Sequence, residues 1–160
     1  MTTNDKKQRN TNNVDATGLT VAANIKRLRG GLSFPELSRR LSAIGRPLPV
    51  IALRRIEEGN RNVTVDDLMA FAIVFGVSPL TLLLPEYASA SMFTKITGCY
   101  RPVSSALAWE WGMCETPLPS KETEDTNNVA RTLEAAELFK FRSSPKRIGG
   151  QSSTWPESGE

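Results

Sequence analysis

The chain has 160 residues, of which 39% are hydrophobic, and a formal net charge of +3 at pH 7. This length fits one domain, or a small domain with an extension, and the hydrophobic content excludes a chain that is disordered throughout. Residues 21–65 carry nine Lys or Arg and three Asp or Glu, a local charge of +6, whereas residues 66–160 carry eight and twelve, a local charge of −4. A basic block on an otherwise acidic chain is typical of a polyanion-binding protein, although a solvated basic surface without a partner gives the same count.

The chemistry open to the chain is limited because it has no histidine and two cysteines, Cys99 and Cys114. Two thiols alone cannot complete a zinc site, and no histidine-based triad is possible. We therefore expect no enzymatic activity, no catalytic residue, no metal and no cofactor. The longest apolar run, 68–77, is too short to span a bilayer, and the N-terminus lacks the apolar segment of a signal peptide. These features predict a cytoplasmic protein with reduced thiols and no membrane contact.

The N-terminal part of the chain divides into a polar arm and a first helix. Residues 1–19 have almost nothing to bury and are expected to be disordered. A helix is predicted over 20–29, with Thr20 as its N-cap and Gly30-Gly31 as its stop. Its apolar stripe consists of Val21, Ala22, Ile25 and Leu28.

The second predicted helix begins at a capping box. Ser33 and Glu36 have the spacing at which their side chains can bond the first N–H groups of a helix, and Leu32 with Leu37 fits a hydrophobic staple. The helix is predicted to run to about Ile44. Its expected buried residues are Leu37, Leu41 and Ile44.

A turn over 45–49 separates this helix from a third one. Neither Pro47 nor Pro49 can sit in a helix interior, so the third helix is predicted to start at Pro49 or Val50 and to end at Gly59. Its periodicity separates two faces. The inward face holds Ala52, Leu53 and Ile56, and the opposite face holds Ile51, Arg54, Arg55 and Glu58.

Two more helices complete the predicted helical unit, which spans 20–86. Thr64 and Asp67 resemble a second capping box. Gly76 ends the fourth helix, and Ser78 caps a fifth that Pro79 opens. The apolar residues of the fourth helix follow i, i+3, i+4, i+7 spacing, as Leu68, Phe71, Ala72 and Phe75. Five short helices predict a compact all-α unit.

The signals weaken after residue 86. Residues 87–142 are predicted to form a small α or α+β extension, followed by a flexible tail over 143–160. The expected elements of the extension are a strand in 91–97, a helix or strand in 104–112, a linker in 116–126 and a helix in 128–141. The extension is poor in Lys and Arg, which favours protein contact or dimerisation over a second contact with DNA. Trp109 and Trp111 fit a protein interface and a small core equally well.

In this order, the motifs of the helical unit resemble the lambda-repressor-like helix-turn-helix domain of the Cro or xenobiotic-response-element type. The residues that carry the resemblance are Ile25-x-x-Leu28-Arg29, Gly31-Leu32-Ser33-x-x-Glu36-Leu37-Ser38, Leu53-x-x-Ile56-Glu57-x-Gly59 and the helix Leu68 to Gly76 leading into Val77-Ser78-Pro79. The connection between the second and third helices is longer than is usual in the family. The Arg46-Pro47-Leu48 turn and the later Trp109-x-Trp111 resemble regulators of actinobacteria and their phages.

The resemblance implies sequence-specific binding of double-stranded DNA, with the third helix in the major groove. The base-reading candidates are Ile51, Arg54 and Arg55. By the resemblance Arg55 is the strongest of them, and Arg54 is expected on bases or phosphate. Arginine can donate two hydrogen bonds to guanine O6 and N7. Val50 and Ile51 have the alternative of burial against the long turn. The phosphate-contacting candidates are Ser33, Phe34, Arg46, Asn60, Arg61 and Asn62.

Four other residues have expected structural or solvated roles. The family pairs a glutamate at the position of Glu57 with an arginine of the first helix, and the matching residue here is Arg27. The resemblance therefore implies an Arg27–Glu57 ion pair, with two exposed charges as the alternative. Ser38 is expected to let the helices approach. Solvated positions are expected for Arg39 and Arg40.

The leading hypothesis is a transcriptional regulator, a phage immunity repressor or a host repressor, that occupies a double-stranded DNA operator in the nucleoid. Such domains usually bind as homodimers, and a monomer stays open. The alternative is an antitoxin that represses its own synthesis through the same domain and binds its toxin through 87–142. The sequence does not identify the operator, the inducing signal or the partner.

Overall fold

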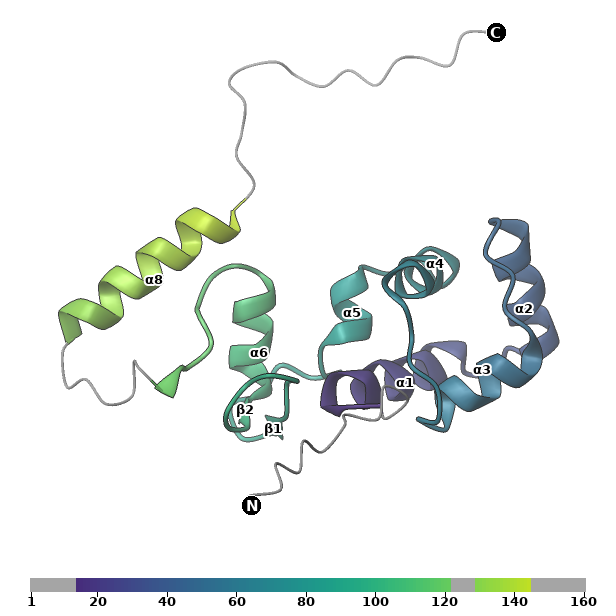
Figure 1. Cartoon of the computed structure of the whole chain (residues 1–160), viewed down its shortest axis with the longest axis horizontal. Coiled ribbons are helices and arrows are strands. Elements are labelled where there is room, and N and C mark those ends of the chain that lie inside the picture. Colours follow the sequence, from purple (N-terminus) through teal and green to yellow (C-terminus); the bar gives the residue numbers. More distant parts are fainter. Residues whose placement is uncertain (1–13, 122–128, 145–160) are drawn as a thin grey trace, which may run out of the picture.

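The computed structural model describes residues 14–121 and 129–144, and the chain is mostly helical in them (Figure 1). The elements in chain order are α1 (Ala16–Arg29), α2 (Phe34–Ala43), α3 (Val50–Glu57), α4 (Val65–Phe75), α5 (Pro79–Leu83), β1 (Phe93–Thr94), β2 (Val103–Ser104), α6 (Ser105–Gly112) and α8 (Val129–Ser143). Most of the expected arm, 1–13, and the tail from 145 lie outside the described residues, as do 122–128. Within the described ranges, no helix has both the length and the apolarity needed to cross a membrane.

The first helix begins four residues earlier than predicted. Asp15 is its N-cap and accepts a hydrogen bond from the Ala16 N–H at 2.7 Å, whereas Thr20 lies within the helix and donates its hydroxyl to the Ala16 carbonyl. The boundary expected at residue 20 therefore falls inside α1. Tertiary contacts stabilise this extra turn: Leu19 lies against Gly59, where an added Cβ would come 2.8 Å from Leu19 Cδ2. A contact of this kind cannot be predicted from the periodicity of the local sequence.

The N-caps predicted for α2, α4 and α5 are confirmed, but the capping box at α2 is only half formed, because the Glu36 carboxylate accepts hydrogen bonds from Arg39 and Arg40. The hydroxyls of Ser33, Thr64 and Ser78 accept hydrogen bonds from N–H groups in the first turn of the helix that each precedes. Gly76 ends α4 in the left-handed conformation, with φ of 66°. Ile44 is the exception among the expected core residues, because it is the C-cap of α2 and is 45% exposed. The chain turns away at Gly45, whose φ is 78°, before Ile44 can enter the core.

Helices α1 to α5 enclose one apolar core, and Figure 1 shows them grouped at one end of the molecule. Its buried members come from all five helices and the α2–α3 turn: Val21, Ile25, Leu37, Leu41, Leu48, Leu53, Ile56, Ala70, Phe71, Ala72 and Leu82. Phe71 is fully buried and stacks on Phe75, with 6.0 Å between the ring centroids. Burial of such side chains, at about 1.5–3 kcal/mol each, is the main stabilising contribution to this unit.

The long α2–α3 turn is held by two polar contacts. Ser38 donates its hydroxyl to the Leu48 carbonyl at 2.6 Å, and Leu48 is buried. Arg46 Nε lies 2.7 Å from Asp67 Oδ1 on α4, and the Asp67 side chain is 3% exposed. Burial by itself would raise the pKa of Asp67, but the hydrogen bonds from Arg46 and Thr64 outweigh burial and lower it.

We expect Asp67→Asn to lower the free energy of unfolding by about 1–2 kcal/mol at pH 7, because it removes the charge that Arg46 and the helix end stabilise. Since the folded pKa is lowered, this contribution is complete above the ordinary value of 3.8 and is lost as the pH falls through the lower folded value. Urea unfolding of both proteins at pH 7, 5 and 3 measures the difference.

Asp66→Asn is the matched control, because the Asp66 side chain is 79% exposed and lies 3.9 Å from Arg46. Its effect should stay within about 0.5 kcal/mol. Equal effects of the two substitutions at pH 7, or a difference for Asp67→Asn that persists undiminished at the lowest pH, would contradict the assignment.

The extension adds a short hairpin and a helix to the helical unit. Strands β1 and β2 are antiparallel, with Phe93 opposite Ser104 and Thr94 opposite Val103. Strand β1 is shorter than the strand predicted in 91–97, because the chain turns soon after it, at Gly98, where φ is 88°. The segment for which helix and strand were open is the helix α6. A second apolar cluster forms between α5, the hairpin and α6, with Leu84, Val103 and Ala108 buried at its centre.

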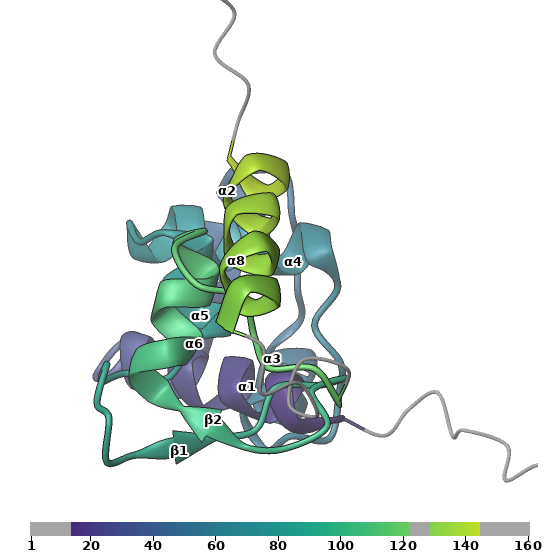
Figure 2. The same cartoon turned by 90° about the vertical axis from the view of Figure 1, so that its left-hand side faces the viewer.

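Two sets of hydrogen bonds connect α1 to the end of α5 and to the loop after β1. Thr17 and Thr97 each donate their backbone N–H to the other's hydroxyl, at 3.1 and 3.0 Å. The buried Asn24 donates to the carbonyls of Leu82 and Leu84, at 3.0 and 2.8 Å. Figure 2, which views the molecule from the α8 end, shows the hairpin and α6 beside α1 and α5. The Thr17–Thr97 contact therefore joins the extension to the start of α1, and the Asn24 contacts fix the end of α5, from which the extension leaves the five-helix unit.

Candidate nucleic-acid interface

Helix α3 has the two faces that its sequence predicts. Ala52, Leu53 and Ile56 are at most 1% exposed, whereas Ile51 is 63% exposed and Arg54 and Arg55 are also exposed. The alternative of a buried Ile51 is therefore wrong, and Val50 is half-buried. Within 14–121 and 129–144, the Arg55 side chain makes no hydrogen bond or ion pair. Its guanidinium is free to meet an outside acceptor.

The ring of Phe34 positions Arg54, the other exposed arginine of α3. The Arg54 guanidinium carbon lies 4.9 Å from the centroid of the Phe34 ring, and that of Arg29 lies 4.2 Å from it. Cations at this distance are attracted by the electron-rich ring face. Phe34 is the first residue of α2, so the contact places Arg54 beside the N-terminus of that helix.

The N-terminus of α2 leaves few N–H groups for a ligand. Pro35 has none, and Glu36 donates its own to the Ser33 hydroxyl at 3.3 Å. Phe34 therefore supplies the outward N–H of this helix end, where the helix dipole also favours an anion. Ser33 acts as the cap that orients this turn.

The carboxylate of Glu36 would oppose an anion here, but two arginines bind it. Arg39 donates to it at 2.7 and 2.8 Å, and Arg40 at 3.0 Å. These hydrogen bonds lower the pKa of Glu36 to about 2. The solvated positions expected for Arg39 and Arg40 are confirmed, since both side chains are exposed, and both arginines also bind Glu36 on their own helix.

The ion pair expected between Arg27 and Glu57 is wrong in its arginine. Arg29 binds Glu57 with two hydrogen bonds, Nε to Oε1 at 2.6 Å and Nη2 to Oε2 at 3.0 Å, and the side chains are 17% and 6% exposed. Arg29 lies one turn beyond Ile25 on the buried stripe of α1, so it points to α3. Arg27 lies off this stripe and donates to Asn24 Oδ1 at 3.2 and 3.3 Å.

The Arg29–Glu57 pair affects both partners and the surface near them. The hydrogen bond that Arg29 donates to Glu57 raises the pKa of Arg29, against the opposing effect of burial. Because its carboxylate is engaged and almost fully covered, Glu57 does not present a negative charge on the outer face of α3. The pair instead ties the end of α1 to the last turn of α3.

The other phosphate candidates separate into two groups. Arg46 is already bound by Asp67 and lies 3.9 Å from Asp66, so its charge is offset and it is not carried into the interface. The segment after α3 remains, because its three residues, Asn60, Arg61 and Asn62, are all exposed.

A shallow cavity of about 300 Å³ lies where α1, α2 and α3 meet. It is lined by Lys26, Arg29, Phe34, Arg54, Glu57 and Glu58. Sequence reasoning named neither Lys26 nor Arg29 as a site residue, although both are basic residues in the last turn of α1. In the described ranges, no cluster of three His, Cys, Asp or Glu residues could hold a metal ion.

Comparison with known proteins identifies no relative of this chain: no family model, no curated protein and no solved structure matches it.

Proposed function

We propose that the chain is a sequence-specific, double-stranded-DNA-binding transcriptional repressor, of a phage or its host. In this proposal α1 to α5 form a lambda-repressor-like domain in which α2 and α3 are the helix-turn-helix. One observation supports it most: the outward face of α3 carries an exposed Ile51 and an unengaged Arg55, while the acidic Glu57 of the same helix is buried against Arg29. A groove-binding helix needs cationic and apolar side chains on its contact face, and the burial of Glu57 removes one carboxylate from that face. Glu58, the C-cap of α3, remains exposed and accepts a hydrogen bond from the Asn60 amide at 3.4 Å.

The geometry supports a division of labour between bases and phosphates. Arg55 would donate two hydrogen bonds to a guanine in the major groove, and Ile51 would contact a thymine methyl group. Arg54, held by Phe34 beside the α2 N-terminus, would join the Phe34 N–H at a phosphate. On the other side of α3, Asn60, Arg61 and Asn62 would contact a phosphate further along the backbone. Phosphate contacts set the register, and base contacts supply specificity.

The experiment is selection of bound duplexes from a random pool, followed by affinity measurements on the enriched sequence with the full chain. We expect an enriched motif, and Arg55→Ala should weaken binding about tenfold and relax the preference at one guanine position. A palindromic motif with half-sites about one helical turn apart would indicate a dimer, and a single half-site would indicate a monomer.

Arg101→Ala is the matched control, because Arg101 is an exposed arginine of the extension and lies outside α1 to α5. It should reduce affinity far less than Arg55→Ala and leave the motif unchanged. The proposal fails if no sequence is enriched at low salt, or if Arg101→Ala and Arg55→Ala act alike.

A second candidate, the antitoxin, has one observation in its favour. Helix α8 exposes three large apolar side chains, Leu133, Leu138 and Phe141, at 63%, 47% and 74%. A partner protein such as a toxin would cover them. Expression of the adjacent reading frame alone, then with this chain, tests the idea: growth arrest that this chain relieves would support the antitoxin, and Phe141→Ser should then weaken the relief.

A further inference from the structure

The two tryptophans of α6, Trp109 and Trp111, have different environments. Trp109 packs in the second apolar cluster and donates its indole N–H to the Pro85 carbonyl at 2.8 Å. Trp111 belongs to neither core of the described residues and instead lines a cavity of about 480 Å³. The core alternative therefore holds for Trp109, whereas Trp111 is half-buried and contributes to the wall of the cavity.

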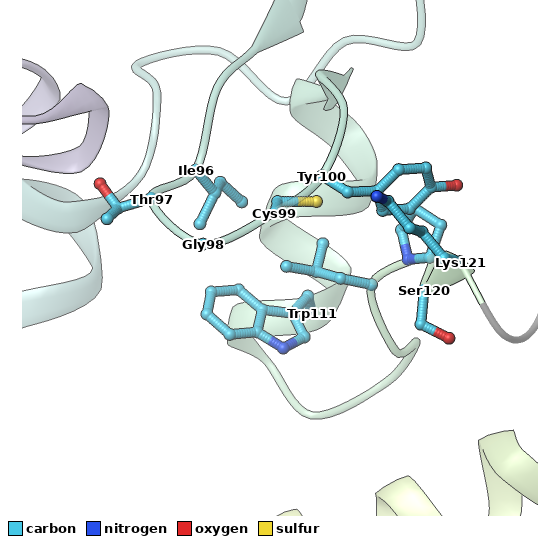
Figure 3. Close-up of a pocket in the computed structure, with 10 residues that line it drawn as sticks. Ile96, Thr97, Gly98, Cys99, Tyr100, Trp111, Ser120 and Lys121 are labelled. Atoms are coloured by element: carbon cyan, nitrogen blue, oxygen red, sulfur yellow. The ribbon is translucent and has the colours of Figure 1, made fainter. Parts of the chain in front are cut away.

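The lining of this cavity is apolar with one formal charge. Figure 3 shows the indole of Trp111 beneath the loop 96–99, with Lys121 across the opening. Ile96, Leu118 and Pro119 supply the other apolar walls, and no Asp or Glu is among the lining residues that the structure describes. The volume lies within the range of small-molecule sites, and the cavity is open to solvent. Mostly apolar walls with a single charged group suit a ligand that has an apolar body and one charge.

We propose that this cavity binds an apolar or aromatic monocarboxylate. The body of the ligand would lie against the Trp111 ring and Ile96, where burial of apolar surface supplies most of the affinity. Its carboxylate would face the Lys121 ammonium group, and none of the described residues that line the cavity is acidic. Among these residues, a cationic ligand would find no counter-charge. The inference does not depend on DNA binding.

The same loop connects the cavity to α1. In Figure 3 the Thr97 side chain points away from the cavity, and Thr97 exchanges hydrogen bonds with Thr17 in the first turn of α1. A second cavity of about 280 Å³, lined partly by Asp15 and Ala16, lies against the other side of the loop. Because there is space on both sides, the loop 96–99 can shift when a ligand enters the first cavity. Such a shift should change the environment of the Thr17 amide, which donates a hydrogen bond to Thr97.

Titration of the full chain with three matched probes tests the site. The probes are 4-phenylbutyrate, 4-phenylbutanamide and 4-phenylbutylamine, and the readout is the NMR signal of the Trp111 indole N–H and the Thr17 amide. The carboxylate should give saturable shifts at both, the amide should bind more weakly, and the amine should bind weakest. Lys121→Gln should weaken carboxylate binding about two- to fivefold, as expected for an exposed ion pair, and leave amide binding unchanged.

Lys95→Gln is the matched control, because Lys95 lines the second cavity and not the first. It should leave all three affinities unchanged. The proposal is overturned if none of the probes shifts the Trp111 signal saturably, if the amine binds as well as the carboxylate, or if Lys95→Gln and Lys121→Gln have equal effects. Both substitutions alter exposed side chains, so the folded state is retained for the comparison.

Discussion

Glu57→Ala should lower the free energy of unfolding by about 3 kcal/mol, the largest effect that we expect from a single charged residue of this protein. The substitution leaves the Arg29 guanidinium without its two carboxylate hydrogen bonds in a position where the side chain is 17% exposed. Removing one member of a buried pair is costly because the other charge stays away from water. Chemical denaturation of the full chain measures the loss.

Glu58→Ala provides the matched control, since Glu58 is the next residue and is exposed. It should change stability by no more than about 0.5 kcal/mol. A double-mutant cycle identifies the partner: Glu57→Ala should couple with Arg29→Ala and not with Arg27→Ala. Coupling to Arg27 instead, or equal losses for Glu57 and Glu58, would contradict the geometry.

Asn24→Ala should destabilise the protein by about 2–4 kcal/mol, because it leaves the carbonyls of Leu82 and Leu84 without their shared donor. The Asn24 amide is 4% exposed, so water cannot replace it without opening the contact between α1 and the end of α5. Asn24→Asp should be at least as damaging, because a carboxylate cannot donate to either carbonyl. Thermal and urea unfolding give both values.

Asn60→Ala is the control of the same residue type, on the exposed segment after α3. It should leave stability unchanged within about 0.5 kcal/mol. A similarly small effect of Asn24→Ala would show that the hydrogen bonds from Asn24 to the Leu82 and Leu84 carbonyls contribute little to stability. Since Asn24 lies where α5 leads into the extension, hydrogen exchange in the segment after Leu84 should rise with the destabilisation.

Much of the five-helix unit follows from residues three or four positions apart. Ser33, Thr64 and Ser78 cap their helices as predicted, because each hydroxyl meets an N–H in the very next turn. The faces of α3 also follow, since the position of a side chain around a helix depends on its register alone. Thus the burial of Leu53 and the exposure of Arg55 could be predicted before the structure.

The extension was less predictable for a physical reason. Its strands are two residues long, and Phe93 is 68% exposed, so neither alternation nor a long apolar run marks them. Likewise, the first turn of α1 depends on Thr97, eighty residues away in the chain. Local patterns do not predict elements whose stability comes from such distant partners.

The sequence by itself determined the N-caps of α2, α4 and α5, the inward and outward faces of α3 and the place of the basic block, because these depend on neighbours along the chain. Only the tertiary structure decided the partners of the polar side chains: Arg29 and not Arg27 at Glu57, Asp67 at Arg46, and Trp109 but not Trp111 in a core. The reason is geometric. Residues two positions apart on a helix point in nearly opposite directions, and the choice between them rests on where a distant segment packs.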